Sequence, residues 1–185
     1  MNQYIAFLRG INVSGHKKIK MGDLKMLFET LGYQYITTYI QSGNVIFQTE
    51  SSSIAELKKN IENAIRSHYN FEVAVLLINK QSLSDILDAN PFKEDISTGK
   101  VDQKRMYFTL LFEKPEYVRI AEILKHDYKP EKLVIRDSTV YFLISKGYGN
   151  TKLNNNFFEN KLKVTATTRN FSTLNKLREL CLVTT

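Results

Sequence analysis

The feature that most constrains the fold is the order of the apolar segments. Their spacing predicts strands or helices, in chain order, at residues 3–9, 21–31, 35–40, 45–47, 54–69 and 73–78. The segments at 21–31 and 54–69 have the helical period, and the other four are β-branched or aromatic runs typical of strands. The resulting order, strand-helix-strand-strand-helix-strand, predicts a ferredoxin-like plait.

The same order returns in the second half of the chain. Apolar spacing predicts elements at residues 105–112, 115–124, 133–136, 140–144, 153–162 and 164–168, with a last helix at 171–182. We therefore predict an α+β protein of two ferredoxin-like β-α-β-β-α-β plaits in tandem. The predicted first half is 1–80, a helix and polar linker occupy 81–104, and the second half with its C-terminal helix is 105–185. The duplication rests on element order, since no residue-level repeat relates the halves.

Cysteine use and hydropathy favour a cytoplasmic protein. Cys181 is the only cysteine, so no internal disulfide can form and a reducing compartment is expected. The longest apolar run, residues 73–78, is far too short to span a bilayer, and the N-terminus does not resemble a signal peptide. We expect no membrane association.

The net charge of +7 is concentrated in the second half. Residues 1–90 carry 9 Lys and Arg against 8 Asp and Glu, whereas residues 91–185 carry 17 against 11. Such an excess is compatible with an anionic small molecule or a nucleic acid as partner, and equally with a solvated surface, because no dense basic tract accompanies it.

The loop after the first predicted strand is the first candidate site. Gly10 and Gly15 have the glycine spacing of a phosphate-binding P-loop, but His16 stands where that motif needs lysine, so we exclude nucleotide triphosphate hydrolysis by this route. Glycines still expose backbone amides, and the residues expected to bind an anion here are Arg9, Asn12, Lys17 and Lys18. The alternative is a mobile surface loop with solvated lysines.

Two further polar segments are candidates for the same chemistry. Ser42 and Asn44 lie in the predicted hairpin turn, where turn formation alone would explain them. Arg169 and Asn170 precede the last helix, where Asn170 is expected to cap the helix. Arg169 could hold a carboxylate or phosphate there, and the alternative is an ordinary surface arginine. Residues 146–152 resemble a flexible binding loop, and equally an ordinary loop without a ligand.

The predicted topology separates these motifs. Taking the strand order as 4-1-3-2 with strands 1 and 3 parallel, we expect the Arg9–Asn12 and Ser42–Asn44 motifs at opposite ends of one sheet, about 15–20 Å apart. The same reasoning groups Arg9, Asn12, Lys17 and Lys18 with residues 146–152. It groups Ser42 and Asn44 with Arg169 and Asn170.

Several chemistries find no support in the sequence. The three histidines and one cysteine lack metal-ligand spacing, so we predict no metal site and no cofactor. No acid–base pair can be named, which leaves open whether the protein is an enzyme.

These segments also carry a resemblance to a known family. Residues 4–13 (YIAFLRGINV) and 38–47 (TYIQSGNVIF) strongly resemble the bacterial domain-of-unknown-function family 1697. Asn90-Pro91 and Arg169-Asn170-Phe171 match its later landmarks. The resemblance implies two ferredoxin-like units and no established activity.

Three functions stay open at this point. The leading hypothesis is a binding protein for a phosphate-bearing ligand or nucleic acid, acting through polar loops. The second is an enzyme that acts on a small phosphorylated metabolite between the halves. The third is a protein–protein interaction module that uses an open sheet face.

Overall fold

The computed structural model describes residues 1–13, 15–51 and 53–183. The strands within these residues form two four-stranded antiparallel sheets, and the chain is an α+β protein. Contacts divide the chain into two compact units. The first unit comprises Met1–Ser84 together with Leu177–Thr185, and the second is Asp85–Lys176.

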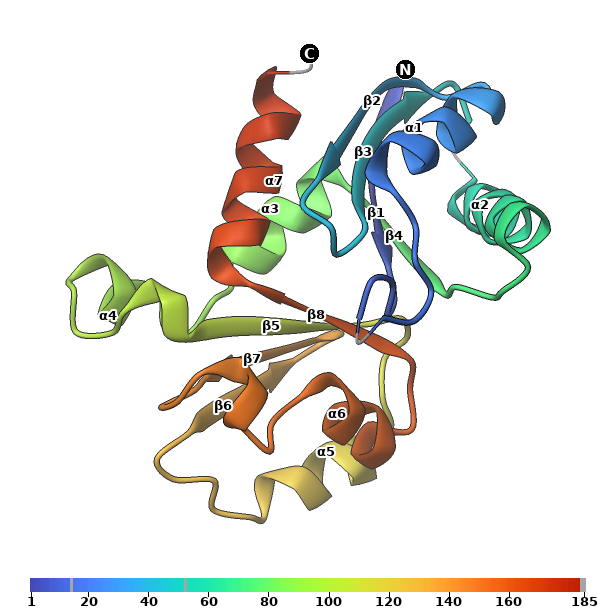
Figure 1. Cartoon of the computed structure of the whole chain (residues 1–185). Helices are drawn as coiled ribbons and strands as arrows, with labels where there is room; N and C mark the ends of the chain where they lie inside the picture. The colour runs from blue at the N-terminus through green and yellow to red at the C-terminus, as the bar shows by residue number, and fades with distance from the viewer. Residues whose placement is uncertain (14, 52, 184–185) are drawn as a thin grey trace. The chain divides into compact units, whose positions relative to one another are not determined.

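The first sheet has the order β2-β3-β1-β4, which read from β4 is the predicted order 4-1-3-2. Its strands are β1 (Asn2–Leu8), β2 (Gln34–Tyr39), β3 (Asn44–Thr49) and β4 (Val75–Asn79). The helices α1 (Met21–Thr30) and α2 (Ile54–Tyr69) cover one face (Figure 1). Alternate residues of β1, among them Ala6 and Leu8, pack under these helices.

The second sheet repeats this order as β6-β7-β5-β8. Its strands are β5 (Met106–Leu111), β6 (Lys132–Arg136), β7 (Thr139–Leu143) and β8 (Ala166–Asn170). The helices of its core are α5 (Tyr117–Leu124) and α6 (Asn155–Leu162), which contribute Ile123, Phe158 and Leu162. Tyr148–Asn150 form a short 3-10 helix, η2, before α6.

The remaining helices follow the last strand of each sheet or connect the units. They are α3 (Lys80–Asp88), α4 (Lys93–Ser97), the 3-10 helix η1 (Gln103–Arg105) and α7 (Phe171–Val183). The polar linker expected after the helix within residues 81–104 thus contains α4 and the first two residues of η1. Both α3 and α7 have residues in each unit, so the contact boundaries differ from those drawn on element order alone.

The expected orientation of the strands was wrong. β1 pairs with β3 antiparallel, with Phe7 opposite Asn44, and β5 pairs with β7 antiparallel. A helical crossover makes β1 and β2 point the same way, and the hairpin then reverses the chain, so β3 opposes β1. The loop after β1 and the turn before β3 therefore lie at the same end of the first sheet, which we call the loop end.

Side chains cap the first turns of α2 and α3. The Ser53 hydroxyl accepts a hydrogen bond from the Glu56 amide at 3.3 Å, which opens α2. At α3, by contrast, the cap is Asn79, whose side-chain oxygen accepts from the Ser82 amide at 2.8 Å. Asn79 thus satisfies one of the free amides in the first turn of α3, which begins at Lys80.

Candidate functional site

The loop after β1 is a folded turn. Gly10 and Asn12 have φ values of 66° and 55°, and Gly15 and Lys17 have 79° and 46°. The Asn12 amide donates to the Lys17 carbonyl at 3.2 Å, which closes the turn. Left-handed backbone at four positions is stable only where surrounding contacts hold it. The loop therefore has a defined conformation that specific contacts hold.

The Asn12 side chain supplies those contacts. Its Nδ2 donates to the carbonyl oxygens of Ile19, at 2.9 Å, and of Gln41, at 2.8 Å. Its Oδ1 accepts from the Ile19 amide at 2.9 Å. One side chain thus fastens both ends of the loop to the β2–β3 turn. Asn12, predicted to bind an anion, holds the loop that carries the basic residues.

The β2–β3 turn is held in the same way. Asn44 is fully buried, and its Nδ2 donates to the Tyr39 carbonyl at 2.9 Å and to the Ser42 hydroxyl at 3.1 Å. Gly43 has a φ of 74°, and a Cβ there would lie 2.7 Å from Ile11 Cδ1. The two motifs expected at opposite ends of the sheet are therefore packed against each other.

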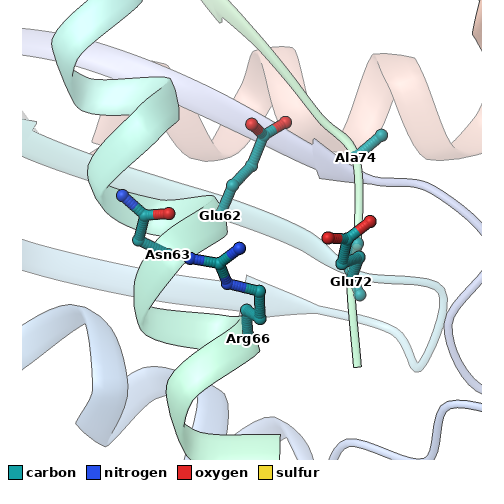
Figure 2. Close-up of a pocket in the computed structure, with 6 residues that line it drawn as sticks. Glu62, Asn63, Arg66, Glu72 and Ala74 are labelled. Atoms are coloured by element: carbon teal, nitrogen blue, oxygen red, sulfur yellow. The ribbon is translucent and has the colours of Figure 1, made fainter. Parts of the chain in front are cut away.

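A pocket of about 310 Å³ opens at the loop end between α2 and the segment that leads into β4. Its lining consists of Glu62, Asn63, Arg66, Glu72, Val73 and Ala74. Figure 2 shows Glu62 extending from α2 toward the strand segment that carries Ala74, with Glu72 on that same segment. We call this space the α2 pocket.

The loop after β1 is fastened to the wall of the α2 pocket. The Lys17 ammonium donates to the Glu72 carbonyl at 2.6 Å, and the Arg9 amide donates to the Ala74 carbonyl at 2.9 Å. An ammonium group has three donors, so this bond leaves Lys17 able to donate to a ligand. Among the predicted site residues, Lys17 thus contacts the backbone of a residue that lines the pocket, although it is not itself part of the lining.

The charges of the α2 pocket are mixed. Glu62 Oε1 accepts from the Val75 amide at 2.9 Å and lies 4.0 Å from the Lys58 ammonium. The guanidinium of Arg66 and the carboxylate of Glu72 make no side-chain hydrogen bond or ion pair with the residues that the structure describes. Sequence reasoning missed Arg66 because an arginine in the last turn of a helix ordinarily complements the helix dipole.

Other basic residues surround the start of α1. Lys18 and Lys20 are exposed, and Lys20 is the N-cap residue of α1 without a side-chain cap hydrogen bond. The first amides of such a helix favour negative charge, although Asp23 in the first turn already supplies one carboxylate. The loop end therefore carries basic side chains from the loop, including the N-cap residue of α1, and from α2.

In the second unit the predicted residues also gather at one end of the sheet. β7 and β8 both end beside the start of β5, where Leu143 faces Met106 and Asn170 faces Tyr107. The expected separation of residues 146–152 from Arg169 was therefore wrong, for the same reason as in the first unit. The ring of Tyr148, from this loop, stacks on Tyr107 with centroids 4.9 Å apart.

Arg169 is engaged within β8. Its Nη1 donates to the Thr167 hydroxyl and to the Thr168 carbonyl, both at 2.8 Å, and only 7% of the residue is exposed. Burial lowers the pKa of Arg169 to about 10, opposed by the nearby Tyr148. Asn170 Oδ1 accepts from the Thr173 amide at 2.8 Å, which is the predicted cap of α7. Both residues thus make hydrogen bonds within the protein, Arg169 along β8 and Asn170 at the start of α7.

Metal and thiol chemistry find no site in the described part of the chain. No group of three or more His, Cys, Asp or Glu side chains there could hold a metal ion. Burial raises the pKa of the Cys181 thiol to about 11, which keeps it protonated at neutral pH. None of the described helices is long and apolar enough to cross a bilayer.

Comparison with known proteins identifies the family. The sequence profile described as "Protein of unknown function (DUF1697)" matches residues 1–141, so the chain belongs to this family, as the N-terminal motifs predicted. The fold is similar to that of the conserved bacterial protein SP0830 from Streptococcus pneumoniae. That likeness has a TM-score of 0.74 at 23% identity and covers 97% of this chain and 98% of the other. No curated protein matches the chain.

Proposed function

We propose that the first unit binds the phosphate group of a small ligand in the α2 pocket. The observation that carries the proposal is the Arg66 guanidinium, which lines the pocket without a protein partner among the described residues. Guanidinium groups bind phosphate oxygens with two parallel hydrogen bonds, and such charge-assisted bonds are about twice as strong as neutral ones. Lys17 adds a second positive charge at the rim.

Preorganisation supports the same proposal. Asn12 fixes the loop, and the Lys17 and Arg9 bonds fix the loop against residues 72–74, so the pocket wall does not need to be ordered on binding. The volume of about 310 Å³ is at the lower end of the range of ligand pockets, roughly 300–1,000 Å³. We further infer that both units are ferredoxin-like plaits, an inference supported by the shared strand order 4-1-3-2.

The test is binding of inorganic phosphate, measured by calorimetry with Arg66→Gln and the control Lys59→Gln. Lys59 is an exposed residue of the same helix that does not line the pocket. Loss of the guanidinium should weaken phosphate binding at least 10-fold, whereas the control should stay within about twofold. Equal affinities for Arg66→Gln and the wild-type chain would contradict the proposal.

A single-stranded oligonucleotide separates a small ligand from a nucleic acid. A nucleic-acid site would bind the oligonucleotide far more tightly than inorganic phosphate, with affinity that falls steeply as salt is added. The small-ligand proposal predicts no higher affinity for the oligonucleotide than for inorganic phosphate. The pocket lining has one guanidinium and two carboxylates, which do not favour a chain of phosphates. Tight, salt-dependent oligonucleotide binding would replace the proposal with the nucleic-acid alternative.

A further inference from the structure

The α2 pocket contains charges of both signs that do not pair with each other. Arg66 follows Glu62 by four residues on α2, which places the two on one face of the helix. No ion pair joins them, nor does one join Arg66 to Glu72, among the residues that the structure describes. Glu62 is instead directed to the Val75 amide, 2.9 Å away. A cation and an anion are thus both available to an occupant of the pocket.

A phosphate group alone uses only part of this arrangement. A phosphate monoester carries about 1.5–2 negative charges at pH 7. Arg66 and Lys17 attract this charge, whereas the carboxylates of Glu62 and Glu72 repel it. A ligand that also carries a positive group would convert that repulsion into attraction.

Of the two carboxylates, that of Glu72 is the more available to bind a positive group of the ligand. Its side chain is exposed and makes no hydrogen bond or ion pair with the described residues, since only its backbone carbonyl is engaged by Lys17. Glu62 has one oxygen committed to Val75 and a lysine 4.0 Å away. The structure therefore leaves a full carboxylate on the wall that faces α2 (Figure 2).

We propose that the ligand of the α2 pocket is a compact phosphate monoester that also carries a primary ammonium group. Arg66 and Lys17 bind the phosphate, and Glu72 binds the ammonium. This inference rests on the proposed function, to which it adds the class of ligand. The pocket volume of about 310 Å³ accommodates a ligand with a short spacer between its two charged ends.

The experiment compares phosphoethanolamine with ethyl phosphate, which has the same phosphate ester but no ammonium group. Calorimetry with the full chain at fixed pH and salt should show phosphoethanolamine binding at least fivefold more tightly. Glu72→Gln should abolish this preference and leave ethyl phosphate binding intact or stronger. Arg66→Gln should weaken both ligands, and the control Glu56→Gln, at an exposed position on α2 outside the pocket lining, should change neither.

The outcomes separate the two proposals. Equal affinities for the two ligands, or a preference that survives Glu72→Gln, would overturn the ammonium inference while phosphate binding stands. Absence of binding by both ligands and by inorganic phosphate would overturn both proposals. Because Arg66, Glu72 and Glu56 are exposed, the variants should melt within a few degrees of the wild-type chain, which excludes unfolding as the cause of lost binding.

Discussion

The two units protect one edge of their sheets with the same contact but differ in the connections around it. In the first unit Glu62 of α2 accepts a hydrogen bond from the amide of Val75, the first residue of β4, at 2.9 Å. In the second, Glu159 of α6 accepts one from the amide of Ala166, the first residue of β8, at 2.8 Å. β4 and β8 are both edge strands. Each carboxylate therefore accepts from a backbone amide that no further strand is present to pair with.

The connections differ in length. Residues 70–74 join α2 to β4, whereas residues 163–165 join α6 to β8. The longer connection forms one wall of the α2 pocket. The first strand is likewise followed by residues 9–20 in the first unit and by residues 112–116 in the second. Both units thus share the hydrogen bond from a helix carboxylate to the edge strand. The candidate site instead depends on the longer connections of the first unit, residues 9–20 and 70–74.

The largest expected effect tests the packing of the loop against the β2–β3 turn. Gly43→Ala places a Cβ 2.7 Å from Ile11 Cδ1 at a φ of 74° and should lower the free energy of unfolding by about 2–4 kcal/mol. Gly99→Ala, at the same φ but with nothing within 4 Å, isolates the backbone strain and should cost about 1 kcal/mol. Chemical denaturation measures both. Equal losses of stability would show that the loop shifts to make room for the added methyl group, so that its packing against the turn is not tight.

The next prediction tests whether the two edge contacts are equivalent. Glu62→Ala and Glu159→Ala should each cost about 1.5–3 kcal/mol, since each removes a charged acceptor from a backbone amide. Glu113→Ala, at an exposed position with no side-chain partner among the described residues, should cost less than about 0.5 kcal/mol. Hydrogen exchange should accelerate at Val75 in the first variant and at Ala166 in the second. If only one variant lost stability, the comparison between the units would fail.

The smallest expected effect separates the two partners of Glu62. The Lys58 ammonium lies 4.0 Å from the carboxylate, and 42% of the lysine side chain is exposed. Lys58→Ala should therefore change the free energy of unfolding by less than about 0.5 kcal/mol. A loss as large as that of Glu62→Ala would mean that the lysine, rather than the Val75 amide, positions Glu62.

Much of the element order could be predicted from the sequence. Helical spacing located α1 and α2, and the turn at Ser42 located the β2–β3 hairpin, because these signals are local. The strand orientation was wrong although the element order was right. Orientation follows from counting chain reversals, and the error moved the loop and the turn to opposite ends of the sheet.

The candidate site was harder to predict, and particular residues show why. Asn12 and Asn44 are of a residue type that often binds ligands. Their side-chain amides instead donate to backbone carbonyls that only the folded chain brings near. Arg66 resembles any arginine near a helix end until the pocket beside it is seen. The matching roles of Glu62 and Glu159 escape a search for repeats, because they precede their strands by 13 and 7 residues.

The assignment of Leu177–Thr185 to the first unit has a consequence for the order in which the protein matures. Leu177 and Cys181 are fully buried, yet they are translated after every residue of the second unit. A nascent chain that has just produced β4 still lacks these side chains, and the second unit can complete its contacts first. The unit whose translation begins first is therefore the one completed last.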